Sequence, residues 1–381
     1  MKWRLVAIVS IRTICLLTVA FLSARLIPYA GNFPYRDLLI SYNLSQVLYS
    51  WANFDGAHYI NIARDGYHQF DQAFFPLYPL MIRALGGLLH KAHLSAGLLV
   101  SYTGFFIGIY YFLKLFSFKY DKKTSEWIVI FLVTFPTAFF FTAVYTEGIF
   151  LMFICLSLYF FYQKKHDRAG IFAFLASLTR LQGFLLIIPF VMYFYEKKKN
   201  FIKNITYMWF KHPIILISPF AGLGVYMIFL QAKFGNPLYF FTSQPAFGAN
   251  RSTSLILLPQ VYYRYLRIFF TADFTYQYCV AMVEFIFFNF VLITSLLFFI
   301  NTWRRKDTFG IGISIFSLAH ILLPPLTGTF SSIPRYALFA WAMFILLAQI
   351  KHVGIKYIVI VLFSILQIIF ASLFIQGYFI S

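Results

Sequence analysis

The sequence predicts an all-α protein that crosses a membrane many times. Of its 381 residues, 61% are hydrophobic, 22% are aromatic and only 11% are charged, and the mean hydropathy is +0.76. A typical soluble domain has about 25% charged residues. The apolar residues also gather in long runs, and about 20 helical residues are enough to span the hydrocarbon core of a bilayer. We therefore expect a single membrane-embedded domain over residues 1–381.

Nine apolar runs are candidate membrane spans. They lie near residues 5–28, 95–116, 127–145, 148–162, 213–232, 280–301, 309–326, 336–350 and 357–378. A further stretch, 170–195, is too long for one simple helix and is interrupted by Thr179-Arg-Leu-Gln-Gly183. We interpret it as two short helices that meet at a polar tip, which gives about eleven transmembrane helices.

Lysine and arginine predict the orientation of these spans, because they concentrate in cytoplasmic connections. If the N-terminus is cytoplasmic, 18 of the 31 basic residues fall in inner segments, whereas the two long outer segments, 29–94 and 233–279, hold eight. The run Lys197–Lys199 would then anchor the inner face. Inner and outer loops alternate in this way only if residues 75–90 do not cross the membrane. Their prolines and Arg83 favour a helix that lies in the interface instead. We expect a bacterial plasma membrane with the active face outward.

Charge and cysteine patterns disfavour two other classes of protein. The net charge of +19 would suit nucleic acid, but the basic residues form short clusters between apolar runs, so we predict no nucleic-acid partner. Cys15, Cys155 and Cys279 lie in or beside apolar runs without the spacing of metal ligands. They therefore predict neither a disulfide framework nor a zinc site.

The densest polar and aromatic segment follows the first apolar run. It reads Trp51-Ala-Asn-Phe-Asp-Gly-Ala-His-Tyr-Ile-Asn-Ile-Ala-Arg-Asp-Gly-Tyr67 and contains Asp55 and His58 one helical turn apart. An ionisable residue at a membrane helix end is rare unless it is paired or functional. The predicted topology brings further polar residues to the same side, with Glu147, Arg180 and Arg335 at outer helix ends and Gln244 and Arg251 in the second outer segment.

These residue types suit a reaction between a polar acceptor and a lipid-linked anionic donor. A carboxylate can take the proton of an acceptor hydroxyl as that hydroxyl attacks. An arginine can hold a phosphate that leaves with its charge. Aromatic rings offer faces for a sugar, and the lipid tail of the donor would lie between helices.

The motifs resemble those of the PIG-V type mannosyltransferases, which add mannose during glycolipid anchor synthesis and have bacterial relatives. The first block consists of Trp51, Asp55-Gly56, Tyr59, Ile62-Ala63, Gly66-Tyr67, Phe74-Phe-Pro-Leu77 and Pro79. The later blocks are Tyr145-Thr-Glu-Gly-Ile-Phe150, Thr179-Arg-Leu-Gln-Gly183, Phe234-Gly-Asn-Pro237 with Gln244, and Pro334-Arg-Tyr336. Together they cover nearly the whole chain.

The resemblance implies a GT-C type glycosyltransferase fold with the catalytic carboxylate in the first outer loop. It also implies a polyprenyl-phosphate sugar as donor, a glycolipid or glycan as acceptor, and inversion at the anomeric carbon. Asp55 is the matching position for the general base. Substrate contacts are expected from the other candidates, His58, Glu147, Arg180, Gln244, Arg251, Arg335 and Tyr336. Phe54 stands where the family more often has Trp, and Asp55-Gly-Ala57 lacks the second acid of an Asp-x-Asp, so no metal pair is obvious. No cofactor is predicted beyond the lipid-phosphate sugar donor, and the need for a divalent metal stays open.

Each candidate also has a purely structural interpretation. Asp55 would be suited to cap a short helix that runs to Arg64 and ends at Asp65-Gly66. Glu147 would pair with Arg180 or Arg335 to neutralise charge near the bilayer, and arginines at helix ends also bind ordinary lipid headgroups. Glu284, inside an apolar run, has no evident partner in the sequence.

Two other functions remain alternatives to a sugar transferase. A transporter or lipid flippase without covalent chemistry would also have many spans and a few buried charges, although such proteins often show repeated halves and broken helices near the bilayer midplane. A ligase that moves a whole glycan would share the outer cavity and the lipid-phosphate donor. The sequence therefore favours a glycosyltransferase but leaves the sugar and the acceptor open.

Overall fold

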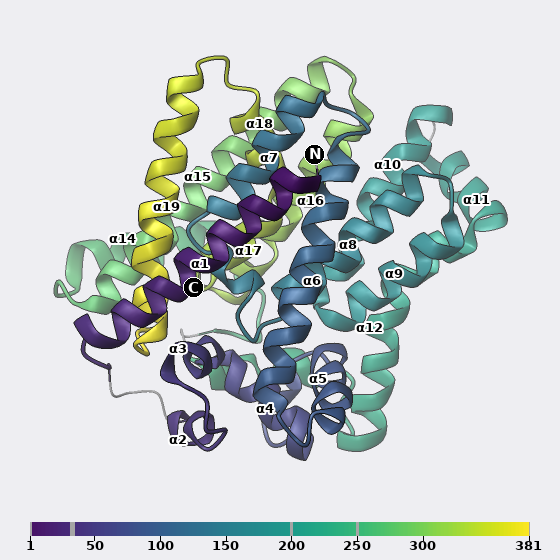
Figure 1. The fold of residues 1–381 in the computed structure, drawn as a ribbon. Helices are drawn as coiled ribbons and strands as arrows, with labels where there is room; N and C mark the ends of the chain where they lie inside the picture. The colour runs from purple at the N-terminus through teal and green to yellow at the C-terminus, as the bar shows by residue number, and fades with distance from the viewer. Residues whose placement is uncertain (1, 31–34, 199–200, 249–250, 381) are drawn as a thin grey trace.

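The computed structural model describes residues 2–30, 35–198, 201–248 and 251–380. Over these ranges the protein is 78% helical and has no β-strand (Figure 1), which confirms the all-α prediction. Lys199 of the predicted anchor run lies outside the described residues, as do the side chains of its two neighbours, Lys197 and Lys198.

Within the described ranges, six helical segments are long and apolar enough to cross a membrane. They are formed by α1 (Lys2–Leu26), α6 (His93–Phe116), α12 (Pro213–Phe234), α15 (Tyr276–Arg304), α16 (Thr308–Leu322) together with the following 3-10 turn, and α19 (Val353–Ile375). Three shorter apolar segments accompany them in the described part of the chain: α5 (Leu77–Leu88), α8 (Glu147–Tyr162) and the stretch formed by the 3-10 turn η4 (Leu181–Leu186) and α10 (Ile187–Lys198). These lengths and compositions are those of a multi-pass membrane protein.

The predicted hairpin over residues 170–195 is confirmed. Helix α9 (His166–Thr179) ends where Arg180 takes an extended conformation, with φ −151° and ψ 148°, and η4 follows at once. The connection after α10 leads through α11 (Phe201–Lys211) into α12. The break therefore places Arg180 at the tip between two helices, as the sequence indicates.

Two other predicted spans are shorter than their apolar runs. In the run 127–145, helix α7 (Lys122–Thr134) ends before Pro136, because a residue that precedes proline avoids the helical region. A 3-10 turn, η3 (Ala138–Phe141), takes its place. In the run 336–350, only α18 (Trp341–Ala348) is an α-helix.

The two irregular segments meet inside the protein. The Thr137 hydroxyl donates a hydrogen bond of 2.6 Å to the carbonyl of Pro334. Phe141 also packs edge-on against Phe339, at a centroid distance of 6.2 Å. Non-helical backbone at membrane depth is tolerated where protein buries it. Arg335 therefore lies in the short helix α17, and the chain approaches Glu147 through the 3-10 turn η3, so neither position belongs to a continuous membrane-spanning helix.

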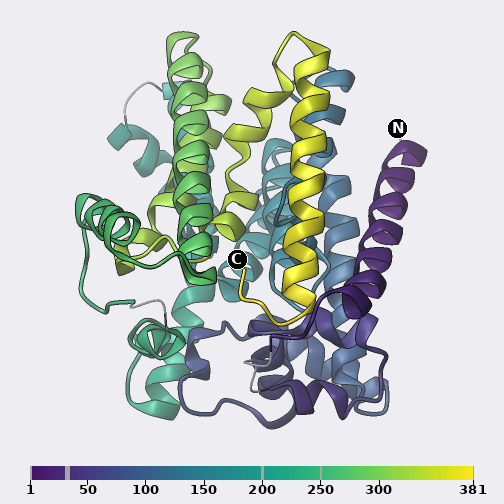
Figure 2. The ribbon, with the colours of Figure 1, turned by 90° about the vertical axis from the view of Figure 1, so that its left-hand side faces the viewer.

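Short helices form a layer across one end of the long ones. In Figure 2 the purple and blue layer lies beneath the bundle, at the opposite end from the N-terminus of α1. The layer consists of α2 (Arg36–Ile40), α3 (Gln46–Tyr49), the 3-10 turn η1 (Ser50–Ala52), α4 (Asp55–Asp65), the 3-10 turn η2 (Asp71–Ala73) and α5. The long loop after the first span is therefore folded into short helices, as predicted.

The remaining short elements adjoin this layer or the irregular segments. They are α13 (Tyr239–Thr242), η5 (Gln244–Phe247), α14 (Leu258–Thr271), η6 (Pro324–Thr327), α17 (Ile333–Tyr336) and η7 (Ala337–Phe339). Helix α14 carries exposed Tyr263 and Phe270 on one side and buried Val261 and Tyr265 on the other. An amphipathic helix with exposed aromatic residues is typical of the interface between lipid and water.

Close backbone contact holds the start of α8 in place. A Cβ atom added at Gly148 would collide with the carbonyl oxygens of Phe141 and Ser101. One turn of α6 away, a Cβ at Gly104 would lie 2.8 Å from Cα of Ile149. Small residues at such crossings allow membrane helices to approach closely. The position of Glu147, next to Gly148, therefore depends on these glycines.

We predict that Gly148→Ala lowers the thermal stability of the purified protein. The added methyl group has no free space, and overpacking of this kind costs about 1–3 kcal/mol. Gly224→Ala in α12 is the matched control, because nothing lies within 4 Å of its added Cβ. The control should raise stability slightly through helix propensity. Thermal unfolding in detergent measures both, and equal midpoints for the two variants would contradict the packing argument.

Candidate functional site

A cavity of about 640 Å³ lies between the layer of short helices and the irregular segments. Every one of the eight predicted site residues lines it: Asp55, His58, Glu147, Arg180, Gln244, Arg251, Arg335 and Tyr336. They come from six separate elements or loops spread along the chain. The volume is in the range of sites that hold small molecules or cofactors.

Asp55 is the first residue of α4 and faces an arginine from the other end of the chain. Arg335 Nη1 donates to Asp55 Oδ2 at 2.6 Å, with side chains 12% and 29% exposed respectively. Phe54, immediately before Asp55, has φ 58° and ψ −119°, a conformation that residues other than glycine rarely adopt. Backbone strain of this kind tends to occur at functional sites.

The capping interpretation of Asp55 is wrong, because its carboxylate makes no capping hydrogen bond to α4 and pairs with Arg335 instead. The other boundary prediction is confirmed. Helix α4 ends at Asp65, and Gly66 follows with φ 95°, which favours glycine. Asp65 pairs with Arg64 at the surface, away from the cavity lining.

Backbone contacts join the start of α4 to the start of α8. The Val144 amide donates to the Trp51 carbonyl at 3.0 Å, and the Tyr145 hydroxyl donates to the Asn53 carbonyl at 3.0 Å. A Cβ at Gly56 would lie 3.1 Å from the Val144 carbonyl oxygen. The two segments that carry Asp55 and Glu147 therefore form one unit.

Glu147 holds two arginines. Its side chain is buried, and its Oε1 forms an ion pair with Arg180 Nη1 and lies 3.4 Å from Arg335 Nε. Arg180 also donates to the Thr146 hydroxyl at 3.2 Å. The predicted pairing of Glu147 is confirmed with both arginines. Asp55, Arg335, Glu147 and Arg180 thus form a row of alternating charge.

The charges in this row set the protonation of Asp55. Burial works against the ionised carboxylate, but the charge and hydrogen bond of Arg335 outweigh it, with smaller contributions from His58 and Arg251. As a result the pKa of Asp55 lies below its ordinary value of 3.8. Asp55 is therefore ionised at neutral pH while it is paired with Arg335.

Aromatic rings flank both arginines. The Arg335 guanidinium lies 5.3 Å from the Tyr145 ring centroid and 5.5 Å from that of Phe140. The Arg180 guanidinium lies 5.2 Å from the ring centroid of Tyr336. Such contacts stabilise a cation without neutralising it. The carboxylates of Glu147 and Asp55, not the rings, are what balance the charge of these arginines.

His58 and the two polar residues of the second outer segment occupy other parts of the cavity wall. His58 Nδ1 lies 2.9 Å from Asp71 Oδ1, and its ring stacks on Phe74. Arg251 Nη1 donates to Gln244 Oε1 at 3.1 Å. The sequence places Asp71 in the polar group of the first outer loop but not among the expected substrate contacts, and in the structure its contact fixes the orientation of the histidine ring.

A buried cluster that the sequence did not reveal supports the loop before Arg335. The Tyr265 hydroxyl donates to Glu284 Oε2 at 2.6 Å and accepts from the Phe330 amide at 3.0 Å. Thr329 Oγ1 lies 3.2 Å from the same hydroxyl. A carboxylate in an apolar run needs a partner, so Glu284 is the residue from which such a buried polar cluster could have been predicted. The cluster ties α14 and α15 to the loop that leads to Arg335.

No metal site is evident in the part of the chain that the structure describes. There, no three His, Cys, Asp or Glu side chains gather in a way that would hold a metal ion.

We predict strong energetic coupling between Glu147 and Arg180. Removing one partner of a buried ion pair costs about 3–5 kcal/mol, because the other charge stays buried without compensation. Glu147→Gln and Arg180→Gln should each lower the unfolding midpoint sharply, and the double variant should lose much less than the sum. The exposed pair Asp65 and Arg64 is the control, and its double variant should be nearly additive. Additive losses in both pairs would contradict the coupling.

The depressed pKa of Asp55 predicts a pH dependence of stability. A carboxylate whose pKa is lower in the folded state contributes stability that is fully present above the ordinary value of 3.8 and is lost as the pH falls through the folded-state pKa. The difference in unfolding midpoint between the wild type and Asp55→Asn should therefore be constant above about pH 5 and shrink toward pH 3. A difference that grows on acidification would rule out the ion pair as its source.

Comparison with known proteins gives no relative for this chain. No family model matches it, and neither the curated proteins nor the solved structures contain a significant match.

Proposed function

We propose that this protein is an integral membrane glycosyltransferase of the GT-C type. It moves a sugar, with mannose as the first candidate, from a polyprenyl-phosphate donor to a lipid- or protein-linked acceptor, with inversion at the anomeric carbon. The observation that carries the proposal is the contact between Asp55 and Arg335 in a cavity of sufficient size. It combines a base for an acceptor hydroxyl with a cation for a departing phosphate.

In the proposed reaction, the Asp55 carboxylate takes the proton of an acceptor hydroxyl. The acceptor oxygen forms a bond to the anomeric carbon while the bond from that carbon to the donor phosphate oxygen breaks. The electron pair of the broken bond leaves with the polyprenyl phosphate. Arg335 and Arg180 stabilise the negative charge that develops on this leaving group.

Arg335 connects the base to the phosphate. In the unliganded protein it holds the pKa of Asp55 low, which makes the carboxylate a weak base. A donor phosphate would compete for the same guanidinium and draw it away from Asp55. The pKa of Asp55 would then rise toward the range in which a carboxylate accepts a proton readily. Glu147 keeps its contact with the Arg335 Nε side during this change.

The cavity wall also supports a donor with a lipid tail. Phe241, Leu255, Leu323 and Leu326 line the cavity together with the charged residues. Leu255 is 69% exposed at the protein surface, so the apolar side of the cavity reaches the outside of the bundle. A polyprenyl chain would lie along this side while its phosphate meets the arginines.

The identification of the sugar and of the family rests on the sequence motifs. Their likeness to the PIG-V type mannosyltransferases supports mannose and a fold of about eleven crossings, in which the shorter helices complete the six long ones. The bias of lysine and arginine supports a cytoplasmic N-terminus and an active face on the outer side of a bacterial plasma membrane.

A transfer assay tests the proposal. Membranes that contain the wild type should transfer radiolabelled mannose from polyprenyl-phosphate mannose to endogenous acceptors. Asp55→Asn should lower the rate by about 10²-fold or more, because an amide cannot act as general base. Asp65→Asn is the matched control, since Asp65 belongs to the same helix but pairs with Arg64 at the surface. It should retain wild-type activity at equal expression.

Full activity of Asp55→Asn would overturn the role of that residue. Equal signals from wild-type and empty membranes would exclude mannose as the sugar. In that case, flux of labelled lipid across vesicles without any covalent product would favour a flippase or transporter instead.

A further inference from the structure

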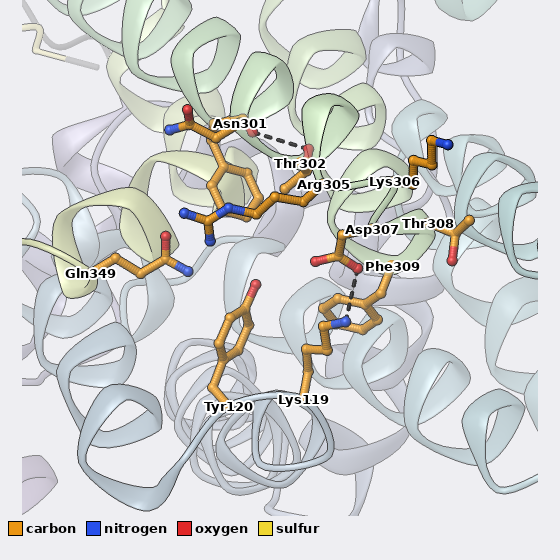
Figure 3. Close-up of a pocket in the computed structure, with 11 residues that line it drawn as sticks. Lys119, Tyr120, Asn301, Thr302, Arg305, Lys306, Asp307, Thr308, Phe309 and Gln349 are labelled. Carbon is orange, nitrogen blue, oxygen red and sulfur yellow. Dashed lines mark hydrogen bonds and ion pairs between the residues drawn. The ribbon is translucent and has the colours of Figure 1, made fainter.

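A second cavity lies at the other end of the bundle from Asp55. Its volume is about 420 Å³, and it is formed where α6, α15, α16 and α18 end or begin (Figure 3). Helix α6 has 24 residues and is therefore about 36 Å long, since an α-helix rises about 1.5 Å per residue, and it runs from the layer of short helices toward this second cavity. The proposed transferase reaction does not use this cavity.

Positive charge dominates the second cavity. Lys119, Arg305 and Lys306 line it, and the one carboxylate in its lining is Asp307. Asp307 is already engaged, because its Oδ1 pairs with Lys119 Nζ at 2.9 Å and accepts from the Gly310 amide at 3.2 Å. In Figure 3 this ion pair forms one side of the cavity, and Lys306 points away from its centre.

Arg305 has no acidic partner of its own among the residues that the structure describes. Figure 3 shows its guanidinium between the amide of Gln349 and the hydroxyl of Tyr120, on the side of the cavity opposite Asp307. A guanidinium fork and neighbouring hydrogen-bond donors match the oxygens of a phosphate. The cavity therefore offers an uncompensated arginine together with polar groups that complete a phosphate site.

The cavity also lies at the ends of apolar helices. Arg305 directly follows α15, and Asp307 directly precedes α16. Lys119 lies three residues after the end of α6. All three helices are long and apolar enough to span a bilayer. Trp303, in the last turn of α15, is 61% exposed, and tryptophan is enriched at membrane interfaces. The cavity is thus at the level of the lipid headgroups.

We propose that this cavity binds the phosphate of an anionic ligand. Its position at the level of the lipid headgroups favours the headgroup of an anionic membrane phospholipid. Arg305 forms the main contact, and Lys119, Gln349 and Tyr120 surround the remaining oxygens. Basic pockets between membrane helices are known to bind anionic headgroups in this way. The ligand would occupy a site separate from the polar row around Asp55.

Native mass spectrometry of the purified full chain in detergent tests the proposal. Phosphatidylglycerol is titrated against wild type, Arg305→Gln and Arg305→Lys, with phosphatidylcholine as the neutral lipid. Arg304→Gln is the matched control, because Arg304 and Arg305 are both exposed but only Arg305 lines the cavity. Losing one basic contact should weaken phosphatidylglycerol binding about fivefold in Arg305→Gln. Arg304→Gln should stay close to wild type, and Arg305→Lys should recover part of the loss.

An excess of inorganic phosphate identifies the source of the ligand. Displacement of phosphatidylglycerol by phosphate would support the phosphate site and assign it to a soluble anion, whereas no displacement would support the lipid. Two results would overturn the proposal. One is equal binding of the two lipids by the wild type. The other is an equal effect of Arg304→Gln and Arg305→Gln, which indicates diffuse attraction to a basic surface.

Discussion

The buried carboxylate of Glu147 is the contact on which the rest of the site depends. It accepts the Arg180 guanidinium and lies 3.4 Å from Arg335 Nε, so it keeps two positive charges at the edge of one cavity. Without this carboxylate, the two arginines would repel each other in a region that water does not easily reach. Each arginine comes from a different part of the chain, one from the break after α9 and the other from α17. The Glu147 side chain, in the first turn of α8, therefore holds together segments that lie far apart in the sequence.

Broken helices make this arrangement possible. A continuous helix over residues 127–145 would carry the chain away from the cavity, whereas the end of α7 at Thr134 allows the chain to turn back toward α8. The segment before Arg335 is irregular as well, and Ser332 within it has φ 66°. Thr137 donates to the Pro334 carbonyl and so satisfies one group of this buried backbone. The cost of interrupting helices in an apolar protein is thus reduced, because this hydrogen bond and the packing of Phe141 on Phe339 hold the two segments together inside the protein.

Much of this organisation could be predicted from the sequence. The apolar runs predict the long helices, and the polar residues around Arg180 predict a break because they interrupt an apolar run. The early end of α7 could not be predicted in the same way, because Pro136 is surrounded by apolar residues and hydropathy does not register its effect on the backbone. The contact between Asp55 and Arg335 joins positions 280 residues apart. The predicted topology places both residues on the outer side of the membrane but does not pair them. The partner of Glu284 was not evident either, since Tyr265 belongs to a different helix.

The same ion pair that positions Asp55 also constrains the order of events in the proposed reaction. While Arg335 contacts Asp55, the low pKa of the carboxylate makes it a poor acceptor of a proton. A water molecule or acceptor that enters first would therefore meet a weak base and no donor. In the proposed reaction, a bound phosphate would give Arg335 a further anion besides Glu147, and movement of the guanidinium away from Asp55 would strengthen the base when a donor is present. The row of alternating charges would in this way link activation of the nucleophile to occupancy of the phosphate position, and would limit wasteful hydrolysis of the donor.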